Sequence, residues 1–168
     1  MITGKQFNEV ILIEAKKIEE SKASIGSLML PDQANIFGNV HGGEIIKVMD
    51  NVAGIVAARH ARSPIVTARI DELEFHRPIH VGNLVTCNAK LAFVGNSSME
   101  VFVEVLVEDL LEQDSTKVAL TAFFTMVAID RNGKPIAVPP LELMDDKERK
   151  LFDDRKEHYL LYKQKRNR

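Results

Sequence analysis

The sequence predicts an α+β fold in which a curled antiparallel sheet wraps around one central helix, with a further helix at the C-terminus. Three observations lead to this class. The apolar segment 41–60 has the length and composition of a buried helix. The segments after it are strand-like, most of them alternating apolar and polar residues. The end of the chain is highly charged. A long helix followed by consecutive strands favours a sheet packed on that helix.

Composition indicates one ordinary domain. The chain has 168 residues, of which 45% are hydrophobic and 27% charged, and this length can bury a core without disulfides. The formal charge of −2 gives no basic field, so we expect no nucleic-acid partner. The single cysteine, Cys87, excludes an internal disulfide and a cysteine metal cluster, and we expect it to fill apolar space.

The N-terminal residues are typical of neither a signal peptide nor a membrane anchor. The apolar run 10–13 is short and acidic residues follow it, and no segment approaches the ~18 apolar residues of a transmembrane helix. We therefore expect a cytoplasmic protein with no membrane partner. We divide the chain into an N-terminal extension (1–22), a folded domain (23–143) and a charged tail (144–168).

The first part of the chain is predicted to contain two helices and a strand. A short amphipathic helix is expected over 7–21. A strand is expected over 23–30, ended by Pro31. The polar residues of 32–40 predict a loop, and the long helix then runs over 41–60.

Three strands are predicted next. The first, over 66–75, changes its apolar phase at Asp71 and Glu72, which predicts a β-bulge and a bent strand. The strands over 85–93 and 99–107 each have one apolar face. One face of the sheet is therefore core, and the other is either wet or covered by a partner.

The last strand and the tail differ in polarity. Residues 118–129 are apolar on both faces, which predicts a central position in the sheet, and Asn132 and Gly133 predict a turn. From residue 144 onward the pattern indicates a charged helix with few apolar anchors, namely Leu151, His158, Leu161 and Tyr162. We expect its charges to form a solvated face rather than a binding site.

Asp50 is the most unusual residue of the long apolar helix. A carboxylate costs several kcal/mol to bury unless it is paired, hydrogen-bonded or functional. At ~100° per residue, Asp50 lies about 60° or more from the exposed side and beside small residues, so a ligand or another chain can approach it. Alone, Asp50 is as consistent with an acid that ties down a partner chain as with a catalytic group.

Gly42 and Gly43 supply a second component at the start of the same helix. Their N–H groups lie in the first turn, where the helix offers no internal acceptor and the dipole is positive. Such a place can hold a carbonyl oxygen or a developing oxyanion. Asp50 lies roughly 10 Å further along the axis, so a site shared between two chains would bring these groups to one substrate more easily.

Three stretches carry a resemblance to a known family: LPDQANIFGNVHGGEIIKVMDNVAG, FHRPIHVGNLVTCNAKLAFVGNSSMEVFVEV and FTMVAIDRNGKPIAVPPLE. The first contains Asn-x-x-Gly-x-x-His-Gly-Gly with an aspartate seven residues beyond the second glycine. Together they resemble the hot-dog fold acyl-CoA thioesterases, in particular the small bacterial acyl-CoA hydrolases related to the brain acyl-CoA hydrolase. The resemblance covers 24–143 and implies the hot-dog fold.

The resemblance implies hydrolysis of a fatty acyl-CoA thioester to a free fatty acid and coenzyme A, without metal or cofactor. By the family's motif, Asp50 activates water or attacks the carbonyl, and Asn35 orients the water or the carbonyl. The amide of Gly43, with Gly42 near it, completes the oxyanion site, and His41 contributes its backbone rather than its ring. In this family the asparagine and the aspartate of one site come from different subunits, which implies a catalytic dimer, often within a trimer of dimers.

The turn at 94–99 matches the family's turn beside the phosphates and pantetheine of coenzyme A. The resemblance therefore implies substrate contacts from four residues, Gly95, Asn96, Ser97 and Ser98. The family usually has a basic or another polar residue where Asn96 stands. No Gly-x-Ser-x-Gly motif surrounds the serines, so we expect them to bind rather than to act as nucleophiles.

Other interpretations of the polar residues stay open. Asn35 suits an Asx-turn in a polar loop. His60, His76 and His80 are typical of structural histidines, and their spacing lacks the convergence that zinc needs. Two further functions are a hot-dog hydratase or dehydratase, which would typically use a catalytic histidine, and a non-catalytic acyl-CoA-binding regulator.

Overall fold

The structure, a computed structural model, describes residues 13–166. Its main element is a five-stranded sheet built from β2 (Ala23–Leu28), β3 (Ile65–Phe75), β4 (Leu84–Val94), β5 (Ser98–Glu108) and β6 (Lys117–Ala128). The strand order is β2-β4-β5-β6-β3, and every neighbouring pair is antiparallel. A second, parallel pair joins two short strands, β1 (Lys16–Lys17) and β7 (Leu141–Glu142).

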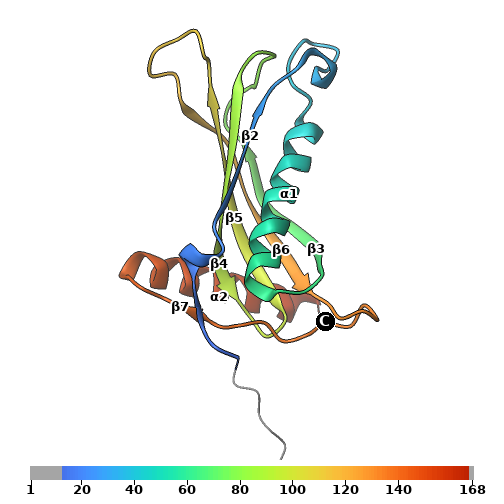
Figure 1. Ribbon diagram of the computed structural model, residues 1–168, viewed down its shortest axis with the longest axis vertical. Coiled ribbons are helices and arrows are strands. Elements are labelled where there is room, and N and C mark those ends of the chain that lie inside the picture. The colour runs from blue at the N-terminus through green and yellow to red at the C-terminus, as the bar shows by residue number, and fades with distance from the viewer. Residues whose placement is uncertain (1–12, 167–168) are drawn as a thin grey trace, which may run out of the picture.

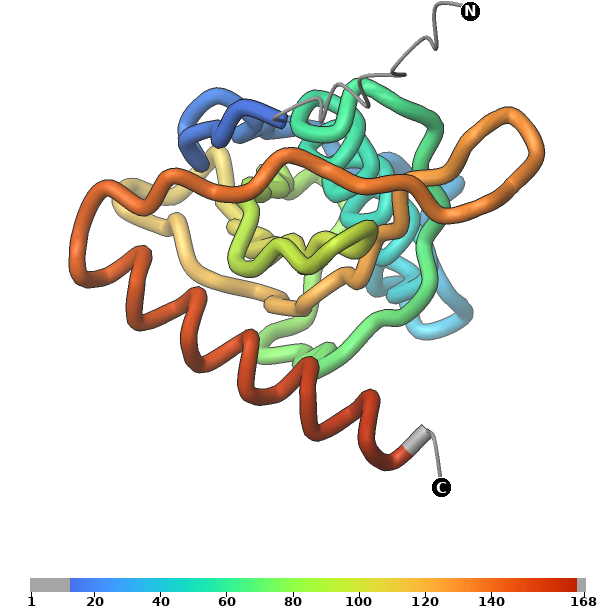
Figure 2. The backbone as a smooth tube through the Cα atoms, turned by 90° about the horizontal axis from the view of Figure 1, so that it is seen from below, coloured from blue at the N-terminus to red at the C-terminus, as the bar shows by residue number. Residues whose placement is uncertain are grey.

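Two helices lie on opposite faces of the sheet (Figure 1). The first, α1 (Gly42–Ala61), is the long apolar helix, and the sheet curls around it. The second, α2 (Asp146–Arg166), crosses the other face near one end of the strands, as the view from below shows (Figure 2). This arrangement confirms the α+β class. No helix within residues 13–166 is long and apolar enough to cross a membrane.

The core lies between α1 and the inner face of the sheet. The helix contributes seven buried residues, Ile45, Met49, Val52, Ala53, Val56, Ala57 and His60. They pack against apolar residues of the strands. In β5 every second residue from Met99 to Val107 is buried, as the period of two predicts. The helix ends at Arg62, which adopts the left-handed conformation with φ 53°. The buried Cys87 is part of this core, and burial raises the pKa of its thiol to about 12.

The predicted strands are confirmed, with two refinements. β6 lies inside the sheet as expected, although β5 occupies the centre. The edge strand β3 contains the predicted bulge, since its register shifts between Asp71 and Glu74 and Glu72 has φ 50°. It also contains a bulge that the pattern missed, between Thr67 and Arg69.

The prediction for the N-terminal part is wrong where it can be compared. In place of the end of a helix over 7–21, the chain forms β1 and a 3₁₀ turn, η1 (Ile18–Glu20); residues 7–12 lie outside the described residues. Ile18 is buried, so the apolar residues mark packing onto the sheet rather than a helical face. The expected strand 23–30 stops at residue 28, and the loop contains the 3₁₀ turn η2 (Pro31–Gln33).

The tail is helical as predicted, and its expected anchors are found in part, since Leu151 and His158 are half-buried. Leu161 is 50% exposed, whereas Arg155 is only 5% exposed. The rings of Phe152 and Tyr159 pack on Phe93, with centroids 5.0 and 5.2 Å away. Most charged residues of this helix are solvated as expected. Arg155 is the exception, because the sheet presents an acid that pairs with it.

Candidate active site

Asp50 lies in the middle of α1 and faces the start of the edge strand β3. Its Oδ1 accepts a hydrogen bond from the hydroxyl of Thr67, with an O–O distance of 2.6 Å. Asp50 is half-buried and Thr67 is exposed. A carboxylate has about four acceptor positions, so one hydroxyl anchors the acid and leaves it capacity to bind a water molecule. The unusual acid of the apolar helix is therefore both held in place and reachable.

Thr67 is a site residue that the sequence reasoning missed. It looks like an ordinary polar residue of an alternating strand, and alternation places it on the same face as Arg69. In β3, however, Thr67 pairs with Met126 and Arg69 pairs with Thr125, so Ala68 is an additional residue. This bulge turns Thr67 toward α1 and Arg69 toward the outer face, where α2 lies.

Asn35 forms an Asx-turn in the loop before α1. Its Oδ1 accepts hydrogen bonds from the N–H of Phe37 at 2.9 Å and from the N–H of Asn39 at 3.3 Å. The side-chain amide group remains a donor that can reach beyond the loop. The turn therefore fixes where this amide lies without using its donor, and the role implied for Asn35 stays a prediction.

The N-terminus of α1 is capped by His41. The ring Nδ1 accepts a hydrogen bond from the N–H of Gly43 at 3.0 Å, so the ring occupies this amide. The N–H of Gly42 belongs to the first residue of the helix and has no possible partner within it. A Cβ at Gly42 would lie 3.1 Å from ring carbons of Phe75, so a larger residue here would require the Phe75 ring to shift.

A mostly apolar hollow of about 190 Å³ lies beside Gly42. Its lining comes from the loop before α1, from α1 itself and from the ends of two strands: Asn39, Val40, Gly42, Ile45, Phe75, Arg77, Pro78, Ile79 and Leu120. The helix N-terminus therefore borders a space with hydrocarbon walls.

The turn at 95–98 lies at the opposite end of the sheet from this hollow. Ser98 is opposite Val127, which pairs with Val66 at the start of β3, whereas Gly42 meets Phe75 at its end. One chain therefore does not bring the turn to Gly42.

The turn itself is held by internal hydrogen bonds. The N–H of Gly95 donates to the carbonyl of Ser98 at 2.8 Å, and the hydroxyl of Ser98 donates to the Tyr159 hydroxyl at 2.9 Å. The carbonyls of Ser97 and Asn96 also accept backbone hydrogen bonds. Asn96 is the exposed member of the four residues.

His60, His76 and His80 have different surroundings. His60 is fully buried, and its Nε2 lies 2.7 Å from the carbonyl oxygen of Pro139. Burial lowers the pKa of His60, although the hydrogen bond to Pro139 opposes this. The Nε2 of His76 lies 3.1 Å from the hydroxyl of Thr121, and His80 is exposed.

One group of possible metal ligands occurs within the described residues. Atoms of Asp71, Glu100 and His158 lie within 4.8 Å of one another. Two guanidinium groups already pair with the carboxylates: Arg69 with Asp71 and Glu100, and Arg155 with Glu100. A cation would have to displace these charges, so the surroundings suit an ion-pair network better than a metal.

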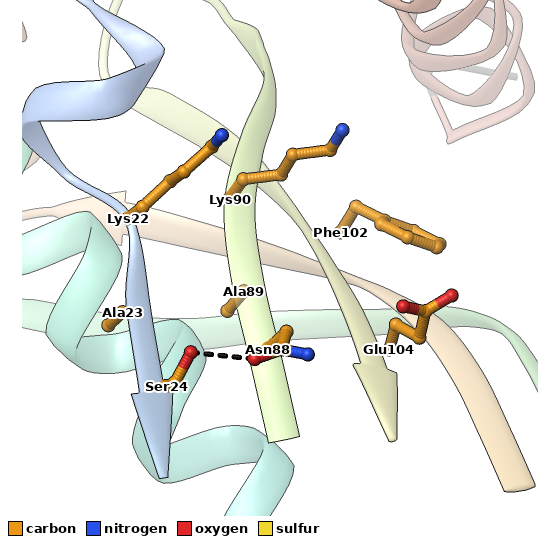
Figure 3. A pocket seen from close by; sticks show the side chains of 8 residues that line it. All are labelled: Lys22, Ala23, Ser24, Asn88, Ala89, Lys90, Phe102 and Glu104. Carbon is orange, nitrogen blue, oxygen red and sulfur yellow. Dashed lines mark hydrogen bonds between the residues drawn. The ribbon is translucent and has the colours of Figure 1, made fainter. Parts of the chain in front are cut away.

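A further hollow lies on the outer face of the sheet (Figure 3). It has a volume of about 400 Å³ and is lined by Lys22, Ala23, Ser24, Asn88, Ala89, Lys90, Phe102 and Glu104. The Ser24 hydroxyl donates to Asn88 Oδ1 at 2.6 Å across β2 and β4. Most of these side chains alternate with core residues of the same strands, so this hollow faces away from α1 and Asp50.

The sheet curled round α1, with an acid of that helix at the sheet edge, defines a protein of the hot-dog fold. The chain matches the thioesterase superfamily over residues 37–112. It is 40% identical over 126 residues to an acyl-CoA thioester hydrolase of Bacillus subtilis, covering 75% of this chain and 73% of that protein. The chain belongs to the acyl-CoA thioester hydrolases of the thioesterase superfamily.

Mammalian relatives are longer than this chain. The cytosolic acyl coenzyme A thioester hydrolase of Rattus norvegicus is 39% identical over 154 residues, which are 91% of this chain and 40% of the rat protein. The chain thus spans about two fifths of the length of the mammalian relatives that it matches.

Solved structures share the fold over most of the chain. A hexameric acyl-CoA thioesterase superposes with a TM-score of 0.85 at 31% identity, covering 91% of this chain and 97% of the other. The acyl-CoA hydrolase of Staphylococcus aureus, solved with butyryl coenzyme A and coenzyme A, gives a TM-score of 0.78 at 30% identity and covers 91% of each chain. Further structures of that enzyme carry alanine in place of an aspartate, an asparagine or a threonine.

Proposed function

We propose that this protein is an acyl-CoA thioesterase, which hydrolyses a fatty acyl-CoA to a free fatty acid and coenzyme A. The observation that carries the proposal is the Asp50–Thr67 pair at an accessible sheet edge. The asparagine, aspartate and threonine replaced in the Staphylococcus aureus hydrolase are separated by 15 and 17 residues. Asn35, Asp50 and Thr67 have the same separations.

The chemistry requires a base, a water molecule and donors for an oxyanion. In the proposed reaction Asp50 takes a proton from water, and the water oxygen attacks the thioester carbonyl carbon. The resulting oxyanion is stabilised by N–H groups and then collapses, expelling the coenzyme A thiolate, which takes up the proton. Direct attack by Asp50, followed by hydrolysis of the anhydride, uses the same residue. The Thr67 hydroxyl keeps the carboxylate aimed in either case.

The oxyanion site is proposed at the N-terminus of α1. Gly42 can donate its N–H because that group has no acceptor within the helix. Gly43 can donate only if the His41 ring gives up its hydrogen bond. His41 therefore acts as a helix cap at the proposed substrate site. The hollow beside Gly42 is proposed to bind the start of the acyl chain.

We propose that two subunits share each site, with Asn35 of one facing Asp50 of another. The loop of Asn35 exposes Ile36 by 93% and Phe37 by 83%, which suits burial in a subunit interface. Val66 and Ile70 are also exposed on the edge strand that carries Thr67. A trimer of such dimers is the proposed assembly, and the hexameric relative supports it.

A shared site also gives the turn at 95–98 a role. In one chain this turn is distant from the N-terminus of α1, so we propose that its Gly95, Asn96, Ser97 and Ser98 contact the coenzyme A of a site that another subunit completes. The reaction needs no metal or cofactor, because a thioester is already activated toward a positioned water. The cytosolic mammalian relatives support a cytoplasmic location.

The test is release of free coenzyme A from acyl-CoA substrates of increasing chain length, with Asp50→Asn as the variant. We expect kcat/KM to fall about 10³-fold because the base is lost. Coenzyme A binding and assembly, measured by calorimetry and light scattering, are expected to be unchanged. Asp153→Asn, an exposed acid of α2, is the matched control and should keep full activity.

Three outcomes would contradict the proposal. Full thiol release by Asp50→Asn would remove Asp50 from the reaction. Hydration of an enoyl-CoA without coenzyme A release would indicate a hydratase. Tight acyl-CoA binding by the wild type with no turnover would indicate a regulator.

A further inference from the structure

A buried network of charges joins α2 to the edge strand β3 across the outer face of the sheet. Its centre is Glu100 of β5, which has no exposed surface. The Nε of Arg155 lies 2.8 Å from one carboxylate oxygen of Glu100, and the Nη2 of Arg69 lies 3.3 Å from the other. Glu100 therefore bridges an arginine of α2 and an arginine of β3.

Both arginines are held on further sides. Arg69 pairs with Asp71 at 2.5 Å, and its guanidinium lies 3.6 Å from the ring centroid of Tyr162 in α2. The Nη1 of Arg155 lies 2.8 Å from Glu72, a residue that has a positive φ of 50° at the second bulge of β3. The network thus contacts the edge strand at or next to both of its bulges.

The first bulge connects this network to Asp50. Thr67 and Arg69 are two residues apart, yet Thr67 reaches Asp50 on the inner side and Arg69 reaches Glu100 on the outer side. The two side chains point to opposite faces of the sheet only while Ala68 remains the unpaired residue of the bulge. β3 is an edge strand, so one strand neighbour, β6, restrains it within the sheet.

The guanidinium of Arg155 remains charged in this network. Burial alone would lower the pKa of Arg155, but the hydrogen bonds and charges of Glu100 and Glu72 raise it above its ordinary value. A buried ion pair of this kind constrains geometry, because each charge is costly without its partner.

We infer that Glu100, held by Arg155 of α2, is a positioning residue for catalysis: it fixes Arg69, and through the bulge of β3 it keeps Thr67 against Asp50. This inference rests on the proposed function of Asp50. By this inference α2 affects the reaction rate, although it packs on the face of the sheet opposite α1 and Asp50 (Figure 1).

The test replaces the buried pair by apolar residues of similar size, in the double variant Glu100→Leu/Arg155→Met. Such replacements commonly keep a protein folded. We expect a kcat about tenfold lower with KM changed less than about twofold, since the substrate contacts are retained. The melting temperature should remain close to that of the wild type, so a loss of fold cannot explain the loss of rate.

A double-mutant cycle with Thr67→Val shows whether the network acts through Thr67. If it does, adding Thr67→Val to the double variant lowers kcat by less than about twofold further, because the Thr67 contact is already lost. Arg155→Lys keeps a charge beside Glu100 but not the planar guanidinium, so its kcat should lie between those of the wild type and the double variant. Lys150→Ala, on the same helix but away from the sheet, is the control and should have no effect.

Two kinetic results would overturn the inference: wild-type kcat in the double variant, or losses that multiply in the cycle. Hydrogen exchange provides a readout that does not depend on activity, since the amides of residues 65–71 should exchange faster in the double variant. If the wild type releases no coenzyme A, the proposed function fails. Unchanged hydrogen exchange of residues 65–71 in the double variant would separately refute the positioning of β3.

Discussion

The two helices have nearly the same length, 20 and 21 residues, and lie on opposite faces of one sheet, but they are held by different forces. α1 buries an apolar stripe against the inner face. α2 is highly charged, and its most buried side chain is Arg155, which lies over the ring of Phe123 at 3.8 Å and pairs with Glu100. A helix can therefore bury a charged side chain where the opposing surface offers a partner of opposite charge, and otherwise buries apolar side chains.

The two helices therefore differ in how strictly their positions on the sheet are fixed. Apolar contacts tolerate small shifts of α1, because the hydrophobic effect has no direction. The Arg155–Glu100 pair requires one position and one orientation of α2, because a planar guanidinium must meet a buried carboxylate. α1 supplies burial, whereas α2 fixes geometry.

The largest effect on stability is expected when the charged contact of α2 is removed. Arg155→Met leaves Glu100 buried with only its longer contact to Arg69, so we expect the free energy of unfolding to fall by about 3 kcal/mol. Urea unfolding followed by circular dichroism measures this. The double variant Glu100→Leu/Arg155→Met should recover most of the loss, because no unpaired charge remains. Equal losses in the single and double variants would show that packing, rather than charge, holds α2.

A pH titration tests the one histidine buried in α1. Because burial lowers the pKa of His60 below its ordinary value of 6.5, the unfolded chain binds a proton at a higher pH than the folded chain. Stability is therefore complete above about pH 6.5 and declines below it. The urea midpoint of the wild type should exceed that of His60→Gln at about pH 7.5, and the difference should shrink at about pH 5.5. A difference that is constant or grows as the pH falls would contradict this.

The smallest expected effect concerns the exposed face of α2. Lys150 donates to Asp154 at 2.8 Å one turn along the helix, and both side chains are exposed. The pKa of Lys150 is raised by the hydrogen bond and the charge of Asp154, but solvent screens such surface pairs. Lys150→Ala should leave the urea midpoint unchanged within error. A clear loss would mean that the exposed charges of α2, and not only Arg155, hold this helix.

Local patterns were sufficient to predict most of the fold. The period of two and the length of the apolar helix correctly predicted α1 and the four long strands of the sheet. The same reasoning failed at 13–21, where the apolar Ile18 packs on the sheet from a 3₁₀ turn rather than from a helix. It also missed the most buried residue of α2, because a sparse apolar pattern cannot reveal that Arg155 has a buried partner 55 residues away.

The candidate site was predictable only in part. Asp50 was detectable because an acid within an apolar helix needs an explanation, and Gly42 because a helix start with glycines can approach a ligand. Thr67 was not detectable, because one additional residue in β3 decides which face it occupies. The turn at 95–98 was recognised by resemblance, but its distance from Gly42 within one chain depends on how the antiparallel strands are ordered.

The two long helices, the four long strands and the most unusual acid could be predicted from the sequence, because helix and strand periodicity and the cost of burying a carboxylate are local properties. Only the tertiary structure decided that Thr67 holds Asp50, that Arg155 and Glu100 form a buried pair, and that α2 reaches the edge strand opposite α1. Those contacts depend on the bulge at Ala68 and on strand order. Neither is visible in the apolar pattern, because both depend on packing between segments far apart in the chain.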